Sequence, residues 1–151
     1  MAKLGTLRKT QFIYSVKFVC GIQDNPKEPV VRPGIYSTDI NIFNFNNVKV
    51  SIVKKIVPLV VKGEVVGREP KYVEKVKFEN IVLPPESATM DDCVKIARFF
   101  NASLPMPISI GFLEIISNKE LDITAVYTVS DIKYGHVSMH VNLIPGRKVT
   151  Y

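Results

Sequence analysis

The chain has 151 residues, of which 46% are hydrophobic and 23% are charged. This length fits one domain, and this composition is that of a globular protein, which excludes the disordered and coiled-coil classes. The formal net charge is +6. However, lysine and arginine are dispersed and do not form the basic stripe with interleaved aromatics that nucleic-acid binders carry. We therefore do not expect nucleic acid as a partner.

The polar, basic residues 1–10 are expected to form an N-terminal arm, and residues 11–151 a single domain. The arm has no apolar core segment, so we predict no secretory signal. The longest apolar runs, such as residues 56–61, are too short to cross a bilayer. The compartment expected by default is the cytoplasm, and the cell surface stays open if another route exports the protein.

The first predicted strand covers residues 12–20, where apolar and polar side chains alternate with a period of two. Its apolar face consists of Phe12, Tyr14, Val16, Phe18 and Cys20. Gly21 is expected to end it, and the proline-rich residues 24–33 are expected to form a loop. A second alternating strand follows Gly34. Further along, Pro58 interrupts a long β-rich run and indicates an edge or a bulge, because proline donates no ladder hydrogen bond.

One segment is predicted to be helical. Thr89 is followed three residues later by Asp92, as in a capping box. Apolar residues then recur at helical spacing, and they are Met90, Cys93, Val94, Ala97 and Phe100. We therefore expect a helix near residues 89–100 that begins at Thr89, with Asp91 and Asp92 in its first turn, where acidic side chains favour the helix dipole.

Three more strands are predicted at residues 108–116, 121–130 and 136–144. Short strands, proline-rich loops and a single helix are typical of an all-β antiparallel sandwich, either immunoglobulin-like or a jelly roll. A parallel α/β sheet would need a helix after nearly every strand. The predicted fold is thus a β-sandwich with one short inserted helix.

Catalytic material is scarce in this sequence. It has no glycine-rich phosphate loop, no G-x-S-x-G elbow, and no H-E-x-x-H or C-x-x-C motif. His136 and His140 share a strand face, but they would stand about 13 Å apart along an extended strand, too far to hold one ion. We therefore predict no catalytic residues, no metal site and no cofactor, so the protein is not expected to be an enzyme.

The two cysteines leave three interpretations open. Cys20 lies on the apolar face of the first strand, and Cys93 lies on the apolar stripe of the helix. They could form a disulfide if the helix packs over the end of that strand. Alternatively, one could be a nucleophile, or both could be buried thiols.

Three stretches resemble an uncharacterised bacterial family of small one-domain β proteins. They are residues 14–21, residues 33–42 and residues 121–130. The resemblance covers about a third of the chain and implies a one-domain β protein with no assigned activity. It transfers no functional residue, although Cys20 lies inside the first stretch.

The leading hypothesis is a non-enzymatic subunit that associates with copies of itself, as a filament, tube, ring or shell. Several strands are apolar on both faces, and such strands lie either under another element or against a neighbouring chain. The arm would contact the neighbour through Lys3, Leu4, Leu7 and Arg8. The alternative is a module that binds a carbohydrate, a peptide or an anionic partner, and its contacts would be Tyr36, Tyr72 and Tyr134. Tyr127 has the same chemistry, but it shares an apolar strand face with its neighbours and is assigned to the core.

Overall fold

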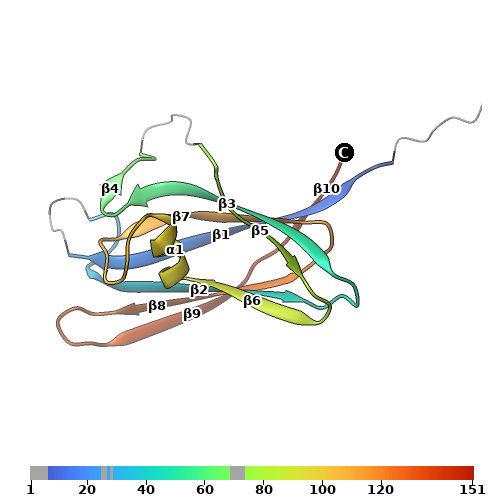
Figure 1. Ribbon diagram of the computed structural model, residues 1–151. Helices are drawn as coiled ribbons and strands as arrows, with labels where there is room; N and C mark the ends of the chain where they lie inside the picture. The colour runs from blue at the N-terminus through green and yellow to red at the C-terminus, as the bar shows by residue number, and fades with distance from the viewer. Residues whose placement is uncertain (1–6, 25–26, 28, 69–73) are drawn as a thin grey trace, which may run out of the picture.

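The computed structural model describes residues 7–24, 27, 29–68 and 74–151. These residues form an all-β antiparallel sandwich with one short helix (Figure 1). The elements in chain order are β1 (Thr10–Gln23), β2 (Gly34–Asn44), β3 (Val50–Val61), β4 (Glu64–Val65), β5 (Val76–Leu83), β6 (Ser87–Asp92), α1 (Cys93–Phe99), β7 (Ser109–Ser117), β8 (Asp122–Ser130), β9 (Val137–Leu143) and β10 (Arg147–Thr150). The predicted fold class is confirmed.

The two layers of the sandwich are connected through β1. In one layer the order is β5-β3-β7-β1-β10, and β4 pairs with the end of β3. In the other layer the order is β6-β2-β8-β9. Residues 12–20 of β1 pair with β7, whereas residues 21–23 pair with β2. One long strand thus belongs to both layers.

The change of partner occurs at Gly21, which was expected to end the strand. That expectation is wrong, because β1 continues to Gln23. Gly21 has a φ of 108°, and a Cβ at this position would lie 2.6 Å from the carbonyl oxygen of Met106. Only glycine fits this backbone angle and this contact, so Gly21 bends the strand and does not terminate it.

Alternation along the strands produces the core as predicted. Tyr14, Val16, Phe18 and Cys20 of β1 are all buried. Isoleucines of β2, β3, β7 and β8 pack against them, together with residues of α1. Each fully buried aliphatic side chain stabilises the fold by roughly 1.5–3 kcal/mol. The bulge expected at Pro58 is also present, because the β3–β7 register shifts between Pro58 and Val60.

The helix begins later than predicted. Its N-cap is Asp92, whose carboxylate accepts a hydrogen bond from the backbone N–H of Lys95 at 3.0 Å. Thr89, the predicted cap, lies in β6 opposite Ile42 of β2. The strand pairing along β2 outweighs the local capping pattern. Asp91 also belongs to β6, and it is fully buried.

The short strand β10 was not predicted. It pairs with residues 10–13 of β1, and Tyr151 and Lys9 exchange backbone hydrogen bonds just beyond it. Because β10 is short and polar, it carries no alternating apolar pattern that would have revealed it. Its limited length matters for the site, since the edge of β1 beyond residue 13 has no β10 partner.

Candidate functional site

Cys20 and Cys93 form a disulfide. The S–S distance is 2.04 Å and the Cα atoms lie 5.6 Å apart. Both residues are buried, where α1 packs on the end of β1. The sequence left three interpretations open, and the structure agrees with the disulfide. Neither sulfur can be a nucleophile while this bond is intact.

The histidines lie apart from each other. His136 precedes β9 and stacks on Tyr134, with 6.0 Å between the ring centroids. His140 lies within β9, and its Nε2 is 2.7 Å from Oδ1 of Asn142. In the described part of the chain, no three metal-ligating side chains come together.

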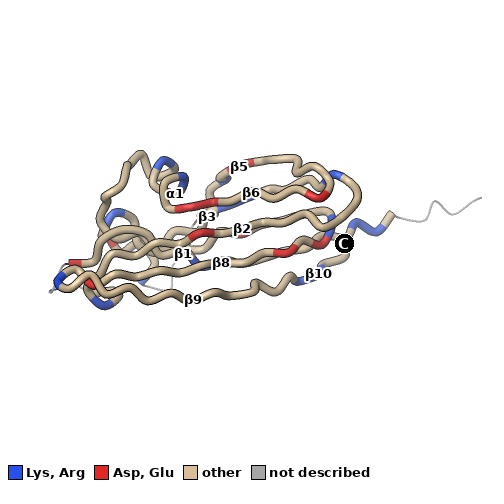
Figure 2. Tube along the Cα trace, turned by 90° about the horizontal axis from the view of Figure 1, so that it is seen from below, with Lys and Arg blue, Asp and Glu red and all other residues tan. Residues whose placement is uncertain are grey.

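β9 is an edge strand that is open to solvent on both faces. Among the described strands it pairs only with β8, and all seven of its residues are exposed. Its sequence contains no charged residue and no proline, and Figure 2 shows it as an uncharged band along one side of the molecule. The outward-facing side chains, with their exposed fractions, are Val137 (69%), Met139 (69%), Val141 (52%) and Leu143 (84%).

The inward-facing side chains of β8 and β9 overhang the edge of β1. Tyr127 and Val129 continue the buried face of β8, since side chains alternate along a strand. The β9 residues opposite them share this face. Tyr127 pairs with His140, and Val129 pairs with Ser138. Because β10 accompanies β1 only over residues 10–13, no strand of the described residues fills the space under this overhang.

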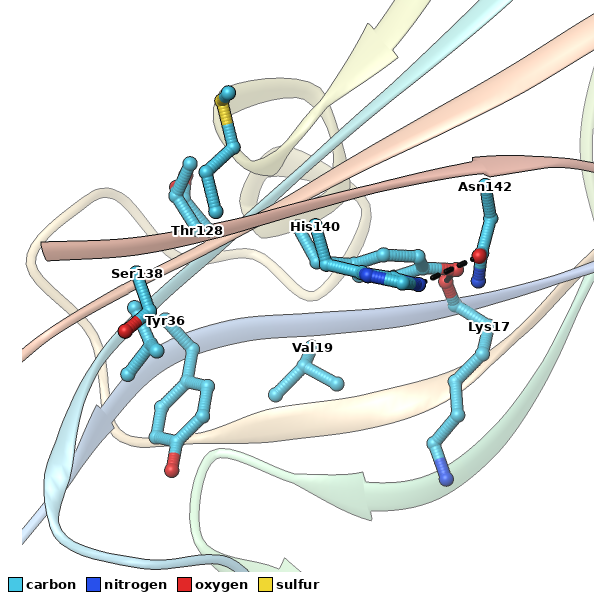
Figure 3. A pocket seen from close by; sticks show the side chains of 11 residues that line it. Lys17, Val19, Tyr36, Thr128, Ser138, His140 and Asn142 are labelled. Carbon is cyan, nitrogen blue, oxygen red and sulfur yellow. Dashed lines mark hydrogen bonds between the residues drawn. The ribbon is translucent and has the colours of Figure 1, made fainter.

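The result is a groove of about 430 Å³ between β1 and the β8–β9 pair (Figure 3). Val19 and Lys17 of β1 line one side, and Tyr36 of β2 closes one end. In Figure 3, the ring of Tyr36 and the side chain of Lys17 extend past β1 in the same direction. A volume of this size lies in the range of small-molecule sites.

Hydrogen bonds hold the two tyrosine walls in place. The hydroxyl of Tyr127 donates to the carbonyl oxygen of Lys17 at 2.7 Å. The hydroxyl of Tyr36 donates to the carbonyl oxygen of Arg32 at 2.6 Å. Burial raises the pKa of both phenols, so they stay neutral at physiological pH. The two tyrosines therefore line the groove with fixed aromatic rings, and their hydroxyl groups already donate hydrogen bonds to the backbone.

The charged and polar groups of the groove are hydrogen-bond donors or can become donors. Lys17 supplies an ammonium group, while Ser138, His140 and Asn142 supply a hydroxyl, an imidazole and an amide. None of the described residues that line the groove is acidic. Within the described ranges, no carboxylate pairs with Lys17, whose ammonium lies 6.0 Å from the centroid of the Phe112 ring.

The sequence identified only part of this site. Tyr36 lines the groove, but Tyr134 is 66% exposed in the β8–β9 turn, and Tyr72 lies outside the described residues. Tyr127, which was assigned to the core from its place on the apolar face of β8, is half-buried and forms a wall of the groove. The period-two pattern of residues 136–144 placed His140 on the polar face of β9, but it could not show what that face overhangs.

The arm residues proposed as assembly contacts are only partly described. Leu7 is 96% exposed, and Arg8 is exposed as well. Lys3 and Leu4 lie outside the described residues.

A second cluster of charged groups lies inside the sandwich, between β3, β5, β6 and α1. Lys54 and Asp91 are both fully buried, with 2.9 Å between Nζ and Oδ2. Glu79 accepts hydrogen bonds from Lys54 at 3.0 Å and from Lys95 at 2.6 Å. Lys95 also lies 2.8 Å from Asp91. Each of these four charged groups has two partners of opposite sign. The cluster is therefore a structural ion network, and none of its four groups is left unpaired to act on a substrate.

Comparisons with known proteins show the fold and nothing more. No family model and no curated protein matches the sequence. The solved structure of Thermotoga maritima 1070 is similar, with a TM-score of 0.50, 9% identity, and coverage of 91% of this chain and 92% of that one. These findings are consistent with the resemblance to an uncharacterised family. Within the described residues, no helix has the length and apolar character that a membrane crossing requires.

Proposed function

We propose that this protein is a non-enzymatic subunit that associates with copies of itself through β9. The observation that supports the proposal is the unprotected edge of this strand. Its backbone N–H and C=O groups on the side away from β8 have no strand partner in the described structure. Such an edge is a template for pairing with another chain.

Natural proteins protect sheet edges with charges, proline, bulges or a covering element. The edge strand β5 carries Lys77 and Glu79, and β10 carries Arg147 and Lys148. In the part of the chain that the structure describes, β9 has none of these devices, and its ladder with β8 runs without a register shift. The contrast within one molecule favours β9 as the strand that pairs with a second copy.

A two-fold arrangement suits the sequence of β9. If two copies pair antiparallel about His140, Val137 comes opposite Leu143 and Met139 comes opposite Val141. Apolar side chains then meet on one face, and polar side chains meet on the other. This contact is isologous, because the same residues of both copies form it.

The experiment is a measurement of molar mass by light scattering, over a range of protein concentrations. We expect dimers or larger species for the natural sequence and monomers for Val141→Lys, which places a charge opposite an apolar partner. Val82→Lys is the matched control, since Val82 is an exposed valine on the edge strand β5. Monomers of the natural protein at high concentration, or equal association of the two variants, would overturn the proposal.

The N-terminal arm would supply a second contact. Leu7 presents an apolar side chain to solvent three residues before the start of β1. A two-fold contact alone closes at the dimer, whereas an additional head-to-tail contact extends the assembly to a ring or a filament. Electron microscopy of Leu7→Ser beside the natural protein tests this part: loss of the larger assemblies with retention of dimers supports it, and unchanged assemblies contradict it.

A further inference from the structure

The groove under β9 has features that self-association does not use. Its walls are formed by Tyr36, Tyr127, Val19 and Val129, and apolar atoms predominate there. Its polar groups come from β9, from Lys17, and from one hydroxyl residue each of β2 and β8. These features recur in small-molecule sites, where an apolar concavity carries a few polar groups that orient the ligand.

The contacts inside the groove argue against a peptide strand and against a sugar. A peptide that added to the edge of β1 would need the backbone groups of residues 17 and 19. The carbonyl of Lys17 already accepts the Tyr127 hydroxyl, and Thr38 bonds both backbone groups of Val19. A sugar would need hydrogen-bonding groups along the walls, whereas the lining is mainly apolar and the hydroxyls of both tyrosine walls are engaged.

Charge indicates what the groove can accept. Lys17 has no acidic partner in the described structure, and no carboxylate lines the groove. The site therefore presents a cation beside a mainly apolar cavity that two tyrosine rings line, with Ser138 and His140 on the β9 side. An anionic group attached to a flat apolar body matches both features.

We infer that this groove binds a small aromatic carboxylate. The ring lies between Tyr36 and Tyr127, where offset or edge-to-face aromatic contacts are favourable. The carboxylate faces Lys17 at the mouth of the groove. The inference does not depend on self-association, because the aromatic walls and the charge that it uses come from β1, β2 and β8, and not from β9.

The test uses 2-naphthoate as the probe and 2-naphthamide as its uncharged analogue, with calorimetry and amide chemical shifts as readouts. We expect saturable binding of 2-naphthoate, with shifts at residues 17, 19, 36, 127 and 140. Lys17→Met keeps most of the aliphatic stem and removes the charge, and we expect it to weaken naphthoate binding roughly fivefold, with little change for naphthamide. Higher ionic strength should weaken naphthoate binding as well.

Two further variants make the test decisive. Lys49→Met changes the net charge equally at an exposed site outside the groove, and it should bind as the natural protein does. Ser138→Trp fills the groove from an exposed position on β9, and it should abolish binding of both probes while circular dichroism confirms the fold. The inference is overturned by any of three results. These are no saturable binding at millimolar naphthoate, equal affinity of the two lysine variants, or binding to folded Ser138→Trp.

Discussion

The hydroxyl of Thr38 bonds both backbone groups of Val19. Thr38 Oγ1 accepts from the Val19 N–H and donates to the Val19 carbonyl oxygen, each at 2.9 Å. Val19 lies on an edge of β1 that none of the described strands covers, just before the strand changes layers at Gly21. A side chain of β2 thus takes the place of a neighbouring strand, and it ties the two layers together beside the disulfide.

Thr38→Val tests this tie. The substitution nearly preserves shape but leaves the N–H and the carbonyl of Val19 without their partner, and an unsatisfied buried polar group costs about 1–3 kcal/mol. We expect the free energy of unfolding, measured with urea, to fall by an amount in this range. Thr124→Val, on the outward face of β8, is the control and should change stability by less than about 0.5 kcal/mol. Equal effects of the two variants would contradict the role of Thr38.

The disulfide connects positions 73 residues apart in the sequence. Cross-linking so long a loop restricts the unfolded chain, and the chain-entropy model gives about 4 kcal/mol for a loop of this size. We expect the Cys20→Ala/Cys93→Ala double variant to lose a large part of this free energy of unfolding. The mass of the purified natural protein, measured before and after alkylation without reductant, should show no free thiol. A protein that alkylates at both cysteines while folded would contradict the bond.

Alternation predicted most of the fold because the buried face of each long strand repeats every second residue. The residues of β1 that the pattern assigned to the core are largely those that the structure buries, although Phe12 is only partly buried. The start of α1 was missed because β6 pairs with β2, a long-range contact that a local capping pattern cannot register. The late end of β1 was missed because Gly21 acts as a bend between two partners.

The groove could be predicted only in fragments. Tyr36 was named from its chemistry, and His140 from its position on a polar face. Their proximity depends on which strand lies under β9, and strand order is not encoded in the period of any one strand. The burial of Lys54, in contrast, is indicated by the sequence, since Lys54 shares a strand face with Ile52 and Ile56. A lysine at a core position predicts a buried acidic partner.

Substitutions of Lys54 and Asp91 are expected to have strongly non-additive effects on the free energy of unfolding. Removing one partner of a buried ion pair typically costs about 3–5 kcal/mol, because the remaining charge stays buried. Here Lys95 still contacts Asp91, so we expect Lys54→Met to lie near the lower end of this range. The double variant Lys54→Met/Asp91→Leu should be less destabilised than the sum of the single variants. Urea unfolding of all four proteins measures this coupling, and simple additivity would show that the pair acts independently.

Glu79 should make stability depend on pH in the acid range. Burial alone would raise its pKa, but hydrogen bonds from Lys95 and Lys54 and the attraction of both ammonium groups hold the pKa below its usual 4.5. A carboxyl whose folded pKa is depressed stabilises the fold above its unfolded pKa, and this contribution is lost as the pH falls through the folded pKa. The natural protein should therefore lose stability below pH 4.5, and Glu79→Gln should show a shallower loss. Melting temperatures measured between neutral and acid pH test this, with Glu86→Gln, an exposed glutamate in the β5–β6 turn, as the control that should retain the natural slope. If Glu79→Gln keeps that slope as well, the ion network does not set the acid stability of the fold.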